Sequence, residues 1–592
     1  MRMRVLTVVL MLAVASGFLC GAARAAGGAD TAPRRWLPVD RNGWTVLRPS
    51  ADTRVIYVSS SVGDDATGRA YAAGDGAAGP NPFLPRGQVR AFKTLAAGMA
   101  QARDGYADWL LLKRGDVWYE PLEGMPNGRS GAEPFLVSAC GVGPRPQLRH
   151  GEKAFGLRMG FSRGFHDIAI VGLELYASIQ DPESPEFAPE RKVNGGAGFT
   201  IWEGALARHL LIEDCCMRFC GASFSNLDSR VEGIVLRRSL ILDNYSRTSH
   251  AQGSWATHMS ILLEENVYDH NGWLIRERNN RKDRGGATIF NHNTYFCDCH
   301  DVVFRGNMFL RPSSMGNKWT ANSGPGSTRN IVIDDNLYVE GEIGIGMGGN
   351  KTGPLRFRNV AVTNNVFLDV GRAQPTYRNL AWYLDVTDWD GGVVARNLFL
   401  HQDVDALTNT HGINLGSSTS KGRYEGEGVH CRNVAILGNV FHGLKTNGYS
   451  VILGQGALLQ NIVFEGNAFQ APGLDSKLVT ADSNLSGVAF RGNAYYSDAE
   501  PAEWFRVGGQ NVAFKDWSAK VREQGARAGK VDYPAPGRCI ETYMASLGME
   551  PTFDAFLAEV RKQSRANWRP EFTAAAVNDW IRAGFGAREA GQ

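Results

Sequence analysis

The stretch RNIVIDDNLYVEG (Arg329–Gly341) decides the fold, because the chain nearly repeats it 29 residues later as RNVAVTNNVFLDVG (Arg358–Gly371). Each copy has apolar residues two positions apart, followed by an Asn and then an aromatic residue. Apolar residues at that spacing are typical of a short strand with one face turned inward. A single pair cannot enclose a core, so each copy must stack on its neighbours.

Looser copies of the phrase recur at intervals of 24 to 42 residues, which suits a solenoid of short parallel strands joined by turns. Stacking places like residues above one another, so the Asn side chains should bond amide to amide and the aromatic rings should stack. We therefore interpret the repeated Asn as structural. Its position is held by Asn266, Asn307, Asn336, Asn365, Asn397, Asn439, Asn467 and Asn493, and upstream by Leu173, Cys215 and Ser239.

The front of the chain carries a second signature. VIYVSSSVGDD is followed by FKTLAAGMAQARDGYADWLLLKRGDVW. With the repeats, this region resembles the right-handed parallel β-helix (pectin-lyase-like) superfamily, in particular its exported bacterial members, over residues 54–500. The resemblance implies an all-β solenoid with an amphipathic helix near residues 92–103 that closes the first coil, since the end of a solenoid is otherwise exposed core. Such a fold hosts many functions, so it does not name a reaction.

The sequence predicts three segments: an export signal (residues 1–25), the β-helix with its N-terminal cap (26–500) and a helical C-terminal cap (501–592). In the last segment, TFDAFLAEVRKQS (Thr552–Ser564) and RPEFTAAAVNDWIRAGFG (Arg569–Gly586) have helix start and stop signals. We expect these helices to pack on the last coil or on a flank. A separate sugar-binding module is the alternative.

The first segment has Arg2 and Arg4, then an apolar run, then Ala23-Arg24-Ala25, which predicts cleavage after Ala25 and a periplasmic or secreted protein. No other apolar run is long enough to span a bilayer. Cleavage would remove three of the 63 basic residues and no acid, which leaves as many bases as the 60 acids. A neutral chain argues against a nucleic-acid partner. We expect a monomer.

Cysteine and acidic residues leave the question of metals open. Cys297 and Cys299 lie in CDCH without a second ligand pair at zinc-finger spacing, so we expect buried thiols or cross-turn pairs rather than zinc. Asp298 and Asp301 are candidate ligands for calcium, which some lyases of the superfamily use. The sequence does not decide whether a metal is needed.

Three long intervals between repeats contain polar loops, at residues 178–196, 270–286 and 401–430. Inserted loops in a solenoid tend to emerge on one face and to build its binding site. The middle loop is strongly basic and is followed by further titratable and aromatic residues within about two repeats. We predict substrate-binding residues there: Arg276, Arg278, Arg284, His270, His300 and Trp319.

A groove with arginine and lysine suits a carboxylated sugar, and flat aromatic faces suit sugar rings. In β-elimination a base removes the C5 proton of a uronate, cations stabilise the developing charge, and an acid protonates the leaving oxygen. We predict His292 or Lys318 as the base, Tyr295 as the acid and an arginine as the stabiliser. The predicted function is cleavage of an acidic polysaccharide by a lyase, or the related C5-epimerisation.

Two alternatives stay open. A glycoside hydrolase of this fold would need paired carboxylates, and the series N-x-D, D-D, G-H-G, R-x-K of polygalacturonase-like members is missing. Asp334-Asp335 lies inside VIDDN, an ordinary repeat, which favours a structural role. The other alternative is a β-helix that binds an exopolysaccharide without cleaving it. The sequence does not name the glycan.

Overall fold

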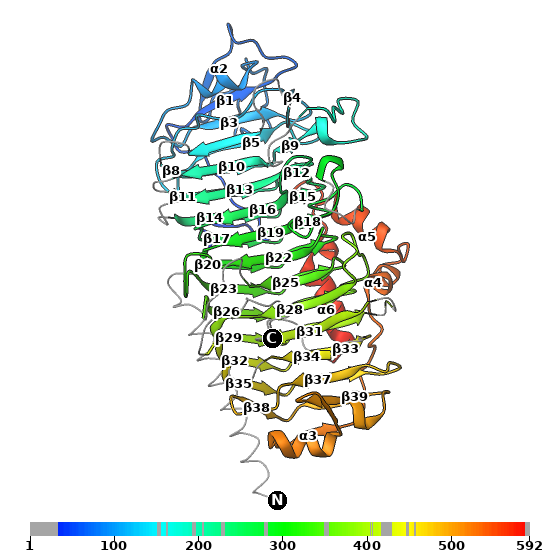
Figure 1. The fold of residues 1–592 in the computed structure, drawn as a ribbon. Coiled ribbons are helices and arrows are strands. Elements are labelled where there is room, and N and C mark those ends of the chain that lie inside the picture. Colours follow the sequence, from blue (N-terminus) through cyan, green and yellow to red (C-terminus); the bar gives the residue numbers. More distant parts are fainter. Residues whose placement is uncertain are drawn as a thin grey trace, which may run out of the picture.

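The computed structural model describes residues 34–150, 156–160, 164–191, 197–203, 207–226, 231–276, 282–348, 355–402, 404, 407–415, 429–445, 449–454 and 458–586. Over this part of the chain, three long sheets of parallel strands wind around one axis, and successive strands of the sequence join the three sheets in turn (Figure 1). The predicted right-handed parallel β-helix is confirmed. Antiparallel pairs occur at the two ends of the coil, between β1 and β2 and between β40 and β41.

We number the sheets in the order in which the chain enters them in each coil. The first sheet contains β1 (Arg54–Val58), β2 (Ala70–Ala72), β3 (Trp109–Lys113), β5 (Phe135–Cys140), β8 (Phe165–Val171), β11 (Ala207–Glu213), β14 (Val231–Arg237), β17 (Ile261–Glu264), β20 (His300–Arg305), β23 (Thr328–Asp334), β26 (Phe357–Thr363), β29 (Trp389–Ala395), β32 (Cys431–Leu437), β35 (Leu459–Glu465) and β38 (Val488–Arg491).

The second sheet is made mostly of very short strands. It contains β4 (Val117–Trp118), β6 (Gln147–Arg149), β9 (Glu174–Tyr176), β12 (Cys216–Arg218), β15 (Leu240–Leu242), β18 (Val267–Asp269), β21 (Met308–Leu310), β24 (Leu337–Val339), β27 (Val366–Leu368), β30 (Leu398–Gln402), β33 (Val440–Leu444), β36 (Ala468–Ala471), β39 (Ala494–Ser497) and β42 (Arg527–Ala528).

The third sheet follows the second in each coil, and two of the three predicted loops, 178–196 and 270–286, connect these sheets. The predicted loop 401–430 instead contains a third-sheet strand at 409–415. The third sheet contains β7 (Leu157–Gly160), β10 (Ala197–Glu203), β13 (Gly221–Asn226), β16 (Gln252–Thr257), β19 (His292–Cys297), β22 (Met315–Thr320), β25 (Ile343–Met347), β28 (Leu380–Val386), β31 (Asn409–Leu415), β34 (Tyr449–Leu453), β37 (Lys477–Ala481), β40 (Phe505–Val507) and β41 (Gln510–Val512).

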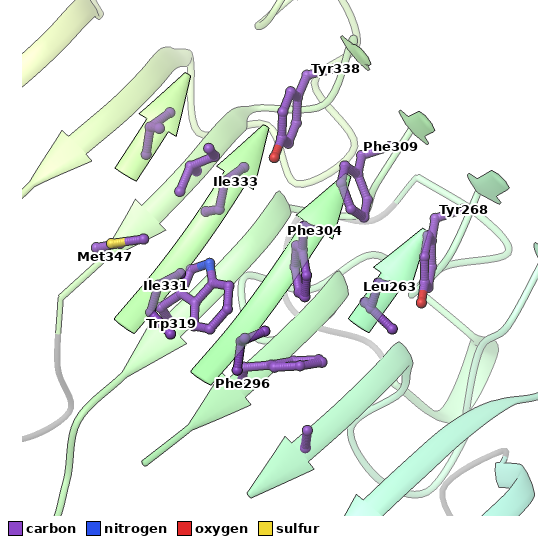
Figure 2. Packing of buried hydrophobic residues seen from close by; sticks show 14 of the residues in the cluster. Leu263, Tyr268, Phe296, Phe304, Phe309, Trp319, Ile331, Ile333, Tyr338 and Met347 are labelled. Atoms are coloured by element: carbon purple, nitrogen blue, oxygen red, sulfur yellow. The ribbon is translucent and has the colours of Figure 1, made fainter. Parts of the chain in front are cut away.

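The repeated aromatic residues form a continuous stack inside the coil. Tyr268, Phe309 and Tyr338 lie in line in Figure 2, with ring centroids 5.2 and 5.1 Å apart. The stack continues from Tyr338 to Phe367 at 4.5 Å. These rings are almost completely buried, so the aromatic residue of each repeat is explained by packing against the next coil.

The repeated Asn residues form a second stack beside the aromatic one. Asn336 Nδ2 donates to Asn365 Oδ1 at 3.0 Å, and the same oxygen accepts the backbone N–H of Asn336 at 2.9 Å. The pattern repeats from Asn266 to Asn493, where Glu523 accepts the last pair of bonds. The Asn ladder predicted from the sequence is confirmed. Each side chain satisfies buried backbone groups at a turn that the strands leave unpaired.

The residue before each ladder Asn has a positive φ, for example 55° at both Asp335 and Asn364. Asp, Asn and Gly tolerate this left-handed conformation better than other residues. That preference explains why six of the eight ladder copies read DN, NN or GN at the turn between the first and second sheets, while Glu265 and Arg396 adopt the same conformation in the other two.

Two short helices close the ends of the coil. Helix α2 (Leu95–Met99), with Thr94 as its N-cap, lies over the first coil, where Gly98 leaves room for Val58 and Leu110. It is shorter than the predicted 92–103. Beyond it Arg103 leaves the helical path and pairs with the buried Asp108 at 2.7 Å. At the other end α3 (Phe514–Val521) covers the last coil.

Three further helices, α4 (Ile540–Ser546), α5 (Phe553–Val560) and α6 (Ala574–Gly584), turn back along the side of the coil (Figure 1). Their apolar faces pack against the outer face of the second sheet, including Leu310, Leu337 and Leu368. Charged contacts add to this, because Arg561 binds both Asp243 and Asp269. We call α4–α6 the helical layer. It covers the outer side of the second sheet.

Candidate functional site

The strands of the third sheet bend where they pass the aromatic stack. In β22 an added Cβ at Gly316 would come within 2.9 Å of the Tyr338 ring, and the next residue, Asn317, bonds the Tyr338 hydroxyl. Two successive residues therefore face inward, and the alternation resumes with Lys318 outward and Trp319 inward. The same bend in β19 turns Tyr295 outward. Gly316 is required in β22 because any side chain at this position would collide with the aromatic stack.

Tyr295 and Lys318 are direct partners on adjacent strands, and both side chains are partly exposed on the outer face of the third sheet. Trp255 on β16 pairs with Tyr295 in the same way and is also partly exposed. Successive strands lie about 4.8 Å apart. An indole, a phenol and an ammonium group thus stand in one row parallel to the axis of the coil, which we call the outer row.

Lys318 and Tyr295 are held by their neighbours. Lys318 Nζ donates to the carbonyl of Gly348 at 2.9 Å. The Thr320 hydroxyl is 3.5 Å from the Tyr295 hydroxyl. These contacts fix both groups against the sheet while leaving them accessible from solvent.

His292 lies next to the outer row but beneath the surface. It is 2% exposed, its ring is 5.8 Å from that of Tyr295, and its Nδ1 has no hydrogen-bond partner in the described part of the chain. Burial, reinforced by the charges of Lys318, Arg378 and His250, holds its pKa well below the usual 6.5. His292 is therefore a neutral imidazole at neutral pH.

The structure thus brings together the three residues predicted to be catalytic: His292, Tyr295 and Lys318 lie on adjacent strands of one face. It also gives them different surroundings. Tyr295 and Lys318 face outward, while His292 is enclosed. Whether they catalyse a reaction stays a prediction.

The basic loop emerges beside this face, between β18 and β19. Arg276 and Arg284 are exposed and form no ion pair with a described residue. Arg278 lies outside the described residues. Phe290, at the end of the loop, is 48% exposed and stacks edge-on with His250 at 5.1 Å. Binding of an anionic ligand by these two arginines stays a prediction.

Trp319 was predicted to bind substrate, and this prediction is wrong. Its side chain points into the coil, where it contacts Phe296 and Phe304 and is completely buried (Figure 2). The reason is the alternation within β22, which turns Lys318 outward and therefore Trp319 inward. A saccharide cannot reach it.

The two remaining histidines are not brought to the outer row. His270 follows β18 at a turn, where it bonds Asp243 at 3.0 Å and contacts the Trp273 ring at 4.4 Å. Since Asp243 also binds Arg561, His270 belongs to the contacts that hold the helical layer. His300 begins β20 on the first sheet and bonds Asp301 at 2.8 Å. Their assignment as substrate-binding residues is not supported by these positions.

Several residues of the same face were missed in the sequence. Trp255 was one, although it occupies the repeat before Tyr295. Further along, Trp382 stacks on His411 at 5.2 Å, and Asp385 accepts bonds from His411 and Asn414 at 3.3 and 3.2 Å. Their signal was the register: each stands at the position of Met315 or Lys318 in a later coil.

The acidic candidates for calcium are engaged by protein groups. Asp298 accepts bonds from the Asn322 and Ser323 amides and from the Ser327 hydroxyl, and its pKa is lowered by these bonds against the effect of burial. Asp301 bonds His300 and Asn330. Among the described residues, no three His, Cys, Asp or Glu side chains gather at metal-binding distance. A calcium requirement stays an open prediction.

The cysteines and the Asp334-Asp335 pair have structural surroundings. The eight cysteines of the described residues are free thiols, and burial raises the pKa of Cys299 to about 12. Asp335 binds Arg582 of α6 at 2.9 Å, and Asp334 bonds Thr363 at 2.7 Å. The aspartate pair thus anchors the helical layer and a neighbouring turn. No helix in the described part of the chain is long and apolar enough to cross a membrane.

No protein-family model and no curated protein matches the sequence. Solved structures with some similarity include a lacto-N-biosidase from Eubacterium ramulus, with 13% identity and a TM-score of 0.31, over 81% of this chain and 68% of that one. A mannuronan C-5 epimerase module from Azotobacter vinelandii has 13% identity and a TM-score of 0.36, over 74% of this chain and 96% of that one. The alginate lyase AlyGC has 14% identity and a TM-score of 0.37, over 75% of this chain and 60% of that one. At these scores, the substrates of those proteins say nothing about the substrate of this chain.

Proposed function

We propose that the protein is an exported enzyme that cleaves an acidic polysaccharide by β-elimination at the outer row of the third sheet. The observation that carries this proposal is the pairing of Tyr295 with Lys318 on adjacent strands, both outward, beside a loop whose Arg276 and Arg284 form no ion pair with a described residue. This arrangement supplies a proton acceptor and a proton donor on adjacent strands, and the neighbouring loop supplies cations.

In the proposed reaction, Lys318 in its neutral form takes the C5 proton of a uronate unit. Electrons move to form the C4–C5 double bond, the C4–O bond breaks, and the Tyr295 hydroxyl gives its proton to the leaving oxygen. Arg276 or Arg284 stabilises the negative charge that develops on the carboxylate in the transition state. The products are an unsaturated uronate and a new chain end.

The structure changes the assignment of the base. His292 is neutral and so able to accept a proton, but it is enclosed, whereas a base must reach the proton that it removes. Lys318 is the accessible candidate. We assign His292 to the support of Tyr295, whose ring it contacts edge-on.

Trp255 completes the site as an aromatic platform one strand from Tyr295. A glycan that runs along the axis of the coil meets a new strand about every 4.8 Å. It can therefore place one sugar on Trp255 and the next over Tyr295 and Lys318. This orientation fits a long polymer better than a small substrate.

The test is to incubate the protein with polymers of mannuronate, guluronate, galacturonate and glucuronate, with and without calcium, and to follow ultraviolet absorbance and product masses. Elimination gives unsaturated products with new absorbance. Hydrolysis gives reducing ends without it, epimerisation changes composition without cleavage, and a binding protein gives none of these. Reducing ends without absorbance would replace the proposal by a hydrolase.

Export rests on residues 1–25, which lie outside the described residues. We propose that they are removed after Ala25. Mass spectrometry of the protein recovered from the native host would give the N-terminus. A mature chain that still begins at Met1 would contradict export by this signal.

A further inference from the structure

A hollow lies at the corner where the chain passes from the second sheet to the third, ahead of the outer row. It is formed by the segments that follow β9 and β15, and its lining includes Gln180, Pro189, Arg191, Tyr245 and Arg247. Two of these are arginines, and none of the lining residues is acidic. The hollow is therefore positively charged.

Arg247 is held in place by two aromatic rings and a backbone carbonyl group. Its guanidinium lies 5.4 Å from the Phe187 ring and 5.9 Å from the Tyr245 ring, and one terminal nitrogen donates to the Pro189 carbonyl at 3.1 Å. Its Nε is shielded from water and has no hydrogen-bond partner among the described residues, with which Arg247 forms no ion pair either. A fixed guanidinium with unused donors is suited to a carboxylate.

Two acids of the same segment are bound to other groups, while Glu190, beside Arg191, is exposed and does not line the hollow. Glu186 pairs with Arg149 at 2.6 Å and accepts bonds from Tyr119 and Ser178. Asp181 accepts the Tyr176 hydroxyl at 2.5 Å. These carboxylates are tied to the second sheet, so they do not neutralise Arg247.

The second arginine adds charge on the open side. Arg191 is exposed. Together with burial, which is the larger cause, its charge lowers the pKa of the nearby His150 to about 4. His150 is therefore neutral at the pH where uronates are ionised, and the charge of the hollow comes from the two arginines.

The hollow is continuous with the site. The Tyr245 ring in its wall lies against Gly285 of the basic loop, so Arg247 and the loop arginines lie on neighbouring coils of one corner. The segment that carries Arg247 leads directly into β16, where Trp255 begins the outer row. A glycan that lies on the row can extend from Trp255 toward the hollow.

We propose that the hollow is a binding subsite for the carboxylate of a uronate unit that lies several sugars from the cleaved bond, with Arg247 as its main ligand and Arg191 as the second. The substrate class of this subsite, an acidic glycan, rests on the proposed function. Binding at the subsite does not depend on whether the glycan is cleaved. The subsite would make the protein prefer long, uniformly charged chains over short or neutral ones.

The test measures binding by calorimetry at low salt in the Lys318→Ala background, which prevents turnover. The probes are hexasaccharides and disaccharides of the four uronates, their carboxyl-reduced forms, and a sulfated hexasaccharide. Arg247→Gln and, separately, Arg191→Gln are compared with the control Arg506→Gln. Arg506 is an exposed residue on β40, at the far end of the third sheet.

We expect at least one uronate hexasaccharide to bind, and Arg247→Gln to weaken it about 10- to 100-fold, the value of a charge-assisted contact. Arg191→Gln should weaken it less. Disaccharide binding, and binding to the Arg506→Gln control, should stay unchanged. Arg247→Lys should restore part of the affinity.

The proposal is overturned if both hollow variants bind the hexasaccharide within twofold of the parent. Equal binding of the carboxyl-reduced form, or tighter binding of the sulfated one, would also overturn it. Failure here can be told from failure of the proposed reaction. Cleavage that is indifferent to Arg247 refutes only the subsite, whereas Arg247-dependent binding of a glycan that is never cleaved refutes only the lyase.

Discussion

The outer faces of the second and third sheets are built on the same coils but carry opposite chemistry. The second sheet turns apolar residues outward, such as Leu310, Leu337 and Leu368, and the helical layer covers them. The third sheet turns Trp255, Tyr295 and Lys318 outward, and these stay partly exposed. A line of outward-facing apolar residues along a solenoid thus marks where the chain folds back on itself. A row of aromatic and charged residues marks where a ligand can lie.

The largest expected effect comes from the third sheet. Lys318→Ala should lower turnover of the cleaved glycan about 10²- to 10⁴-fold, because it removes the base while leaving the fold intact. Lys477→Ala is the matched control, since Lys477 is partly exposed on β37 of the same sheet, far from the outer row. Steady-state kinetics and a thermal melt would be recorded for both. A Lys318→Ala protein as active as the control would contradict the assignment of the base.

On the second sheet the same kind of truncation should change stability and not chemistry. Leu337 is fully buried on β24, the strand that contacts α6. Leu337→Ala should destabilise the helical layer by about 2–5 kcal/mol through lost burial and the cavity that is left. Hydrogen exchange of the α6 amides should become faster while turnover is retained. Unchanged exchange in α6 would show that the layer does not depend on this apolar row.

The Asn ladder gives an intermediate effect that both faces share. Asn365→Ala should cost about 1–3 kcal/mol, because the Nδ2 group of Asn336 and buried backbone groups lose a partner. The exposed pair between Asn461 and Asn433 provides a comparison. Asn461→Gly, which keeps the left-handed backbone, should change stability by less than about 0.5 kcal/mol. Equal losses at the two sites would mean that burial is not what gives the ladder its value.

The last prediction concerns how stability depends on pH through His442. This residue lies between the second sheet and the C-terminal segment, 5.3 Å from the Phe585 ring. Burial lowers its pKa from 6.5 to about 4. The unfolded chain therefore takes up a proton between pH 6.5 and about 4 while the folded chain does not. This contribution to stability is present above pH 6.5 and is lost as the pH falls, by up to about 1.4 kcal/mol per pH unit.

His442→Gln should flatten this acid slope, as measured by thermal melts between pH 7 and 4.5. His292 and His150 have the same direction of pKa shift and will keep part of it. A variant with the full slope of the parent would assign acid sensitivity to other groups.

Much of the fold could be predicted because the same packing and hydrogen-bonding requirements recur in each coil. The Asn at positions such as Asn336 and Asn365, and the aromatic residues two positions later, repeat where stacking demands them. The helical layer was only partly foreseen. Its position follows from the strand phrases LYV and VFL, in which residues on both sides of the central aromatic are apolar, so both faces of the strand are buried.

The site was harder to read, because proximity depends on register rather than on composition. Tyr295 and Lys318 were found together through their place in neighbouring repeats, and the structure pairs them. Trp319 was misassigned because a one-residue difference in a strand reverses the face. Trp255 and Arg247 were missed since they lie a coil earlier, and a sequence without its register gives them no connection to the site.

The most direct test of the central claim is a crystal structure of Lys318→Ala with a hexasaccharide of the glycan that the parent cleaves, or, without cleavage, the uronate that binds most tightly. We predict sugar rings over Trp255 and Tyr295, with a carboxylate within reach of Arg276 or Arg284. A hexasaccharide bound on the first sheet or along the helical layer, with the outer row empty, would contradict the account.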